Sequence, residues 1–202
     1  MTRPGKRLGL IVATLAMALP ALAAAPLPDD MSLGSAKAPV TVIEYASVGC
    51  PHCGAWSREV FPGFKKRFID TGRVRFVLRE MLTGDPDVAA AGFLTARCAG
   101  QAHYFQVVEG LFAAEPQMVA DGSDLPSLLK VAGEAGLSKT QVSDCLSDHA
   151  ALADLEKRVD VHLQADHVDA TPTFDVNGKR LEGEQSLAAL ATAVDQASRR
   201  RR

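Results

Sequence analysis

The sequence predicts an α/β fold interrupted by an all-helical subdomain. Residues 40–79 read as strand, helix, strand, and residues 174–197 read as strand, strand, helix, with no convincing strand between them. A strand–helix–strand unit implies a parallel pair of strands with a right-handed crossover. The helical stretch between the two parts therefore indicates an insertion, which we place at 83–167.

Composition fits one domain that carries such an insertion. The chain has 202 residues, of which 47% are apolar and 23% charged, so it can bury a core and is not of disordered type. The formal net charge of −2 becomes −5 without the three positive charges of residues 1–23, and −9 without the four arginines of 199–202. Because nucleic-acid binding needs a basic face, we expect no nucleic-acid partner.

The N-terminus has the pattern of a signal peptide, which we place at 1–23. Three positive residues within 3–7 precede the uncharged apolar segment 8–19, and Ala21-Leu22-Ala23 is a small-x-small cleavage site. An uncleaved anchor is the alternative, but about 20 apolar residues are needed to span a bilayer. A chain that is exported with four cysteines belongs in the periplasm or the extracellular space, and we expect the periplasm.

The first half of the α/β fold is expected at residues 39–82, after a mobile leader at 24–38. Its expected elements are a strand at 40–46, a helix at 54–70 and a strand at 73–79. Pro62-Gly63 should kink this helix near its middle, because proline removes a helical hydrogen bond and glycine weakens the turn.

The insertion is expected to hold four helices, and the chain then returns to strands. The expected helices lie at 86–114, 124–135, 138–148 and 151–166, with Asp124 and Ser138 as N-caps and Gly136 as a C-cap. The second half, 168–202, should begin with strands at 174–176 and 179–182 around Asn177-Gly178, a dipeptide that favours a type I′ turn. Ser186 then caps a helix at 187–197, and an Arg tail ends the chain.

Cys50-Pro51-His52-Cys53 lies between the first strand and the first helix, which is the context of a thiol–disulfide site. At a helix N-terminus, unpaired N–H groups and the helix dipole would stabilise a Cys50 thiolate. Pro51 suits the first helical turn. Cys53, one turn further, should be the buried resolving thiol, and His52 can add positive charge or a donor near Cys50.

Two further elements are candidates for the same site. Glu44 lies in an otherwise apolar strand six residues before Cys50, where a lone carboxylate is costly to bury. It could exchange the proton of Cys53 through water, although strand alternation could instead turn it toward solvent. Thr171-Pro172 precedes a short strand, and a cis bond there would hold the Thr171 backbone beside a neighbouring site.

These residues resemble the DsbA-like branch of the thioredoxin superfamily. The resemblance is carried by residues 42–47 with Cys50-Pro51-His52-Cys53, by 171–174 and by 176–178. It implies a thioredoxin fold with a helical insertion and a disulfide oxidoreductase whose nucleophile is Cys50. It further implies Cys53 as the resolving thiol, Glu44 as the buried acid and Pro172 as a cis-proline, with the Thr171 backbone pairing with the substrate peptide.

The other two cysteines, Cys98 and Cys145, both fall in the helical insertion. In an oxidising compartment two remaining cysteines more often pair than stay free, so we expect a structural disulfide between them. A second redox pair is the alternative, but they lack Cys-x-x-Cys spacing. His149, His162 and His167 are expected on solvated faces.

The leading hypothesis is therefore a monomeric, periplasmic thiol:disulfide oxidase without cofactor or metal. Its expected partners are reduced or unfolded exported proteins and, by the resemblance, a membrane quinone-linked reoxidase. Three alternatives stay open: an isomerase or reductase of the same fold, a peptide-binding module without catalysis, and a metal-binding protein that uses Cys50, Cys53 and His52. The last would lack the second ligand pair of a closed structural zinc site.

Overall fold

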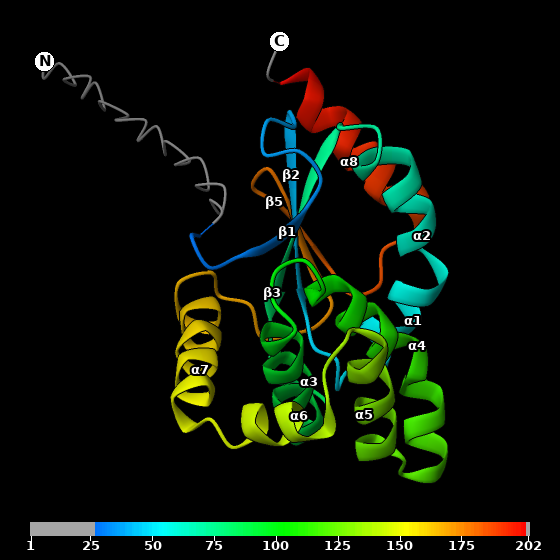
Figure 1. Ribbon diagram of the computed structural model, residues 1–202. Coiled ribbons are helices and arrows are strands. Elements are labelled where there is room, and N and C mark those ends of the chain that lie inside the picture. Colours follow the sequence, from blue (N-terminus) through cyan, green and yellow to red (C-terminus); the bar gives the residue numbers. More distant parts are fainter. Residues whose placement is uncertain (1–26, 201–202) are drawn as a thin grey trace, which may run out of the picture.

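In the computed structural model, which describes residues 27–200, five strands form one mixed sheet (Figure 1). The strands are β1 (Met31–Leu33), β2 (Val40–Ala46), β3 (Val74–Glu80), β4 (Thr173–Val176) and β5 (Lys179–Glu182). Their order is β1-β3-β2-β4-β5, with β2 and β3 parallel and the other neighbours antiparallel. The predicted β–α–β unit thus forms the centre of the sheet, and the α/β prediction is confirmed.

Helices cover both faces of this sheet and one of its ends (Figure 1). The helices are α1 (Pro51–Glu59), α2 (Phe61–Phe64), a π-helical turn (Lys65–Ile69), α3 (Pro86–Cys98), α4 (Tyr104–Asp121), α5 (Asp124–Glu134), α6 (Lys139–Leu146), α7 (His149–Gln164) and α8 (Leu187–Arg199). Helix α7 lies on one face, α1, α2 and α8 lie on the other, and α3 to α6 gather at the end.

The helix expected at 86–114 is two helices, so that prediction was wrong. α3 ends at Cys98 and α4 begins at Tyr104, and Gly100 lies between them with a φ of +81°. A positive φ is open to glycine but cannot continue a right-handed helix, and this explains the break. The N-cap of α6 is Ser138, as predicted, within a capping box that Gln141 completes. For α5 the N-cap is Ser123, not Asp124.

The expected mobile leader is also partly wrong. The predicted signal peptide, 1–23, lies outside the described residues, but within 27–38 the chain forms strand β1. Met31, Ser32 and Leu33 pair antiparallel with Leu78, Val77 and Phe76 of β3. β3 would otherwise present a free edge of backbone donors and acceptors, which β1 covers. Three residues are too few to show strand alternation in the sequence.

The first helix is interrupted near Pro62, as predicted. It begins at Pro51, earlier than the expected Gly54, and α1 ends at Glu59. Val60 leaves the regular helical geometry with a φ of −112°, and α2 then continues through Pro62 and Gly63 into the π-helical turn. Proline has no N–H to continue the ladder of α1, so the break falls just before it.

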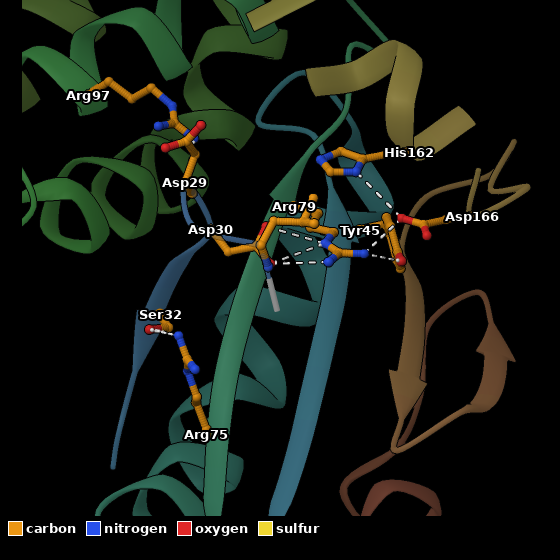
Figure 2. Close-up of polar contacts among 10 residues, drawn as sticks. Asp29, Asp30, Ser32, Tyr45, Arg75, Arg79, Arg97, His162 and Asp166 are labelled. Atoms are coloured by element: carbon orange, nitrogen blue, oxygen red, sulfur yellow. Dashed lines mark hydrogen bonds and ion pairs between the residues drawn. The ribbon is translucent and has the colours of Figure 1, made fainter. Parts of the chain in front are cut away.

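A buried ionic cluster around Arg79 of β3 holds Asp30, just before β1, and Asp166, just after α7, on the sheet face that α7 covers (Figure 2). The Arg79 guanidinium lies 3.1 Å from an Asp30 carboxylate oxygen and 2.7 Å from one of Asp166, and it donates to the Tyr45 hydroxyl at 2.9 Å. His162 packs edge-to-face on Tyr45 and is buried, so its predicted solvated position was wrong. Residues 30 and 166 are thereby tied to the centre of the sheet.

The predicted disulfide between Cys98 and Cys145 is present and joins the end of α3 to α6. Their Cα atoms lie 6.3 Å apart, and 47 positions separate them in sequence. The bond therefore closes a long loop that contains α4 and α5. Such a bond stabilises chiefly by restricting the unfolded chain.

Replacement of both Cys98 and Cys145 by alanine is expected to lower the free energy of unfolding by about 2–4 kcal/mol, the typical contribution of a disulfide. Guanidinium unfolding of the disulfide-intact protein and of the variant measures this difference. An unchanged midpoint would contradict the structural role of the bond. The active-site cysteines should keep their reactivity in the variant, which serves as the control for a native fold.

Candidate active site

Cys50 is the N-cap residue of α1. It has an extended backbone with φ of −105° and ψ of 116°, and Pro51 follows at the first helical position. The Cys50 N–H donates to the Ser47 carbonyl at 3.1 Å, which fixes the turn out of β2. The first N–H groups of a helix have no partner within it, so they are free to donate to a sulfur at this position. The predicted placement of Cys50 at a helix start is therefore confirmed.

Two glycines let the loop after β3 pack on the backbone just before Cys50. A Cβ on Gly49 would lie 2.2 Å from the Asp85 carbonyl oxygen, and one on Gly84 would lie 2.0 Å from that of Gly49. The Asp85 N–H donates to the Gly49 carbonyl at 3.0 Å, and the Ser47 hydroxyl donates to the Thr83 carbonyl at 2.8 Å. The position of Cys50 is thus set by backbone contacts from both strands of the β–α–β unit.

The two active-site thiols have opposite electrostatic environments, and both are free. The pKa of Cys50 is lowered to about 5, first by a hydrogen bond from the Cys53 thiol and then by the Thr171 side chain and the N–H groups of Cys53 and His52, while burial opposes this shift. The pKa of Cys53 is raised, above all by burial. At neutral pH the reduced pair therefore holds one thiolate, on Cys50, and one thiol, on Cys53.

Thr171 and Pro172 lie beside Cys50, and the bond between them is cis. The Cys50 sulfur lies 3.5 Å from the Thr171 carbonyl oxygen. The Thr171 hydroxyl forms a 2.5 Å hydrogen bond with that of Thr83. The segment before β4 is thereby joined both to Cys50 and to the loop after β3.

Glu44 is buried in the middle of β2, with only 2% of its surface exposed. Its side chain lies on the α1 face of the sheet, as do those of Val42 and Ala46 in the same strand. Burial raises the pKa of the Glu44 carboxyl well above its usual range, and negative charge on Cys50 raises it further. A solvated position for Glu44 is therefore excluded, and its carboxyl keeps a proton to higher pH than that of a solvated glutamate.

His52 points into solvent and pairs with an acid that the sequence did not indicate. Its side chain is 74% exposed, and Nδ1 lies 2.6 Å from a carboxylate oxygen of Glu184. The hydrogen bond and the charge of Glu184 raise the pKa of His52, and negative charge on Cys50 adds to this. His52 thus contributes its backbone N–H to the Cys50 sulfur, while its ring is held by the loop between β5 and α8.

Thr83, Glu184 and Gln185 complete the surroundings of the site, and the sequence predicted none of them. Besides the contact of Glu184 with His52, the Gln185 carbonyl accepts a 2.9 Å hydrogen bond from the Trp56 indole. These residues lie in loops without a motif, 36 to 132 positions away from their partners. Only the strand order of the sheet brings them to one edge.

Known proteins resemble the chain over most of its length. A family model described as Thioredoxin matches residues 27–196. A Rickettsia conorii protein provisionally named a protein-disulfide oxidoreductase is 33% identical over 170 residues, which are 84% of this chain and 60% of that protein. Disulfide bond formation protein D of Bacillus subtilis is 28% identical over 154 residues, 73% of this chain and 67% of that protein. The chain therefore spans about 60% of the length of the Rickettsia relative.

Solved structures share the fold. Alpha-DsbA1 of Wolbachia pipientis superposes with a TM-score of 0.78 at 26% identity, covering 87% of this chain and 94% of that one. Oxidised BdbD of Bacillus subtilis gives 0.69 at 20% identity, covering 89% and 98%, and at that identity shows the fold alone. With its β–α–β unit, Cys-x-x-Cys helix start and cis Thr171–Pro172 bond, and with a family model matched over most of its length, the chain belongs to the thioredoxin family and resembles its DsbA-like members.

Proposed function

We propose that the chain is a protein-disulfide oxidoreductase that donates a disulfide between Cys50 and Cys53 to thiols of exported proteins. One observation carries the proposal: the Cys50 sulfur accepts hydrogen bonds at the start of α1, while Cys53 is buried beneath it. Cys50 keeps 6% of its surface exposed and Cys53 none, so this asymmetry gives an outer sulfur that leaves readily and an inner partner that stays a thiol. The relatives named as disulfide oxidoreductases support the same activity.

The exchange proceeds through a mixed disulfide. A substrate thiolate attacks the Cys50 sulfur, the Cys50–Cys53 bond breaks, and Cys53 leaves as a thiolate that takes a proton from Glu44. A second substrate thiolate then attacks the substrate sulfur of the mixed disulfide and expels Cys50 as a thiolate. Two substrate sulfurs are oxidised and the two enzyme sulfurs are reduced, with one proton retained on Cys53.

The direction of exchange follows from the stability of the Cys50 thiolate. Hydrogen bonds that lower the pKa of Cys50 stabilise the reduced enzyme, and a stable reduced form makes the disulfide a stronger oxidant. The buried thiol of Cys53 does not offset this effect, because it is neutral in the reduced pair. The site is therefore suited to donating disulfides more than to reducing them.

A periplasmic location, a membrane quinone-linked reoxidase and a monomeric state belong to the same proposal. The signal-peptide pattern of residues 1–23 supports export, and the relationship to DsbA-like proteins supports a membrane reoxidase. Among the helices of residues 27–200, none combines the length and the apolar character that crossing a membrane requires.

Within the described residues, no group of three or more histidine, cysteine, aspartate or glutamate side chains could hold a metal ion. The metal-binding alternative therefore has no support from the geometry around Cys50, Cys53 and His52. Stoichiometric metal that stays bound after purification under reducing conditions would favour that alternative over disulfide exchange.

Equilibration of the Cys50–Cys53 pair with glutathione tests the direction of exchange. We expect a potential between about −180 and −120 mV, the range of oxidising members of the superfamily. The variant with alanine at 98 and 145 should give the same value, because it keeps only the active-site pair. A potential of about −270 mV would instead identify a reductase.

Glu184→Gln is expected to lower the pKa of His52, because it removes the negative charge that the ring contacts. Titration of the imidazole signals by NMR measures this shift. Glu182→Gln is the matched control, since it removes an exposed carboxylate of β5 without a side-chain contact to His52. If the pKa of His52 is the same in both variants, the pairing of His52 with Glu184 is contradicted.

A further inference from the structure

A narrow hollow separates α1 and α2 from α4 on the sheet face that carries Glu44. The space open to water in it is about 10 Å³, close to the minimum for one water molecule. Three polar residues, Glu44, Ser57 and Glu109, line it, and the rest of its lining is aromatic or aliphatic. The hollow therefore connects the buried acid to polar groups on two helices.

The inner end of the hollow is the Glu44 carboxyl. Its Oε1 atom is buried and has no hydrogen-bond partner among the described residues. Buried polar atoms almost always have a partner, either in the protein or in ordered water. Because the other nearby walls are aromatic or aliphatic, a water molecule in the hollow is the partner that the site can supply.

The outer end consists of Ser57 on α1 and Glu109 on α4. Ser57 is half-buried, and Glu109 is exposed. In the part of the chain that the structure describes, neither side chain is engaged in a hydrogen bond or an ion pair. Partial burial raises the pKa of Glu109, although the charge of Lys65 opposes this. Glu109 can thus take up and release a proton closer to neutral pH than a fully solvated glutamate.

The exchange reaction needs a route of this kind. When Cys53 leaves as a thiolate, Glu44 gives it a proton and is left as a buried carboxylate, a state that burial and the negative charge on Cys50 disfavour. Glu44 therefore regains a proton from solvent, and it must release that proton before it can accept the one that Cys53 gives up on reoxidation. Cys53 has no exposed surface and Glu44 has almost none, so neither can exchange protons with bulk water directly. Each turnover therefore requires Glu44 to regain or lose one proton through the protein.

We propose that Glu44 exchanges its proton with solvent through one water in this hollow. Glu109 is the outer proton carrier, and the Ser57 hydroxyl is a hydrogen-bond partner of the water. The inference rests on the proposed disulfide exchange and deepens it. Glu109 acts through Glu44 and does not touch the reacting sulfurs, so it is a positioning residue for proton transfer. The route moves one proton, and the electrons are exchanged only among the sulfurs.

Single-turnover oxidation of the reduced protein by oxidised glutathione tests the route. Trp56 is the only tryptophan and is a buried residue of α1, three positions after Cys53, so its fluorescence reports ring closure between Cys50 and Cys53. In dilute buffer, Glu109→Gln should slow this closure about tenfold, less than the loss of a direct general acid or base. Ser57→Ala should slow it to a smaller extent.

Three comparisons separate proton transfer from a structural effect. Added imidazole buffer should restore the rate of Glu109→Gln, because a small acid or base can replace the lost carrier. Glu109→Asp should retain most of the wild-type rate. Glu59→Gln, which removes an exposed carboxylate of α1 outside the hollow, should behave as wild type, and the equilibrium constant with glutathione should be the same in all variants.

Equal closure rates in Glu109→Gln and Glu59→Gln would overturn the route and leave the proposed function intact. A slow rate that buffer does not restore would also overturn it. If the wild-type protein does not exchange disulfides with glutathione at all, both the proposed function and the route are overturned.

Discussion

Negative charge on the Cys50 sulfur is stabilised chiefly because α1 begins at that residue. The helix start brings the N–H groups of His52 and Cys53 and the Cys53 thiol to one side of the sulfur. β2 determines where the helix starts, and backbone contacts of Gly49 with Gly84 and Asp85 hold the turn between them. A shift of this turn by one residue would separate the sulfur from its donors, so the loop after β3 is as much part of the site as the cysteines.

A comparison of two buried carboxylates, Glu44 and Glu80, supports a chemical role for Glu44. Glu80 in the neighbouring strand is equally buried, but it contacts Arg97 at 2.6 Å and Arg158 at 3.0 Å and accepts a hydrogen bond from the Tyr104 hydroxyl. Within residues 27–200, Glu44 contacts no such cation, and one of its oxygens has no protein partner. An isolated buried carboxyl is costly to keep ionised and is held instead as a weak acid. That is the state required to exchange a proton with Cys53.

The sequence predicted those features that depend on local chemistry. Strand alternation, the Asn177-Gly178 turn and the Cys50-Pro51 helix start each depend on a few adjacent residues. The central strands, the hairpin and the position of Cys50 at the start of α1 followed from them. β1 was missed because a three-residue edge strand is specified by the open edge of β3 and not by its own pattern. His162 was placed wrongly because its burial depends on contact with Tyr45 in a distant strand. Thr83, Glu184 and Glu109 could not be found, since only the folded topology brings them to the site.

Titration of the Cys50 thiolate by its ultraviolet absorbance in the reduced protein is the most direct test of its stabilisation at the start of α1. The hydrogen bonds to the sulfur predict a midpoint near pH 5. Since the pKa in the folded state lies below that of an unfolded cysteine, the reduced protein should also lose stability relative to the oxidised one as the pH falls from about 8.5 to about 5. A midpoint at about pH 8.5, the pKa of an unperturbed cysteine, would show that the helix start does not stabilise the negative charge on Cys50.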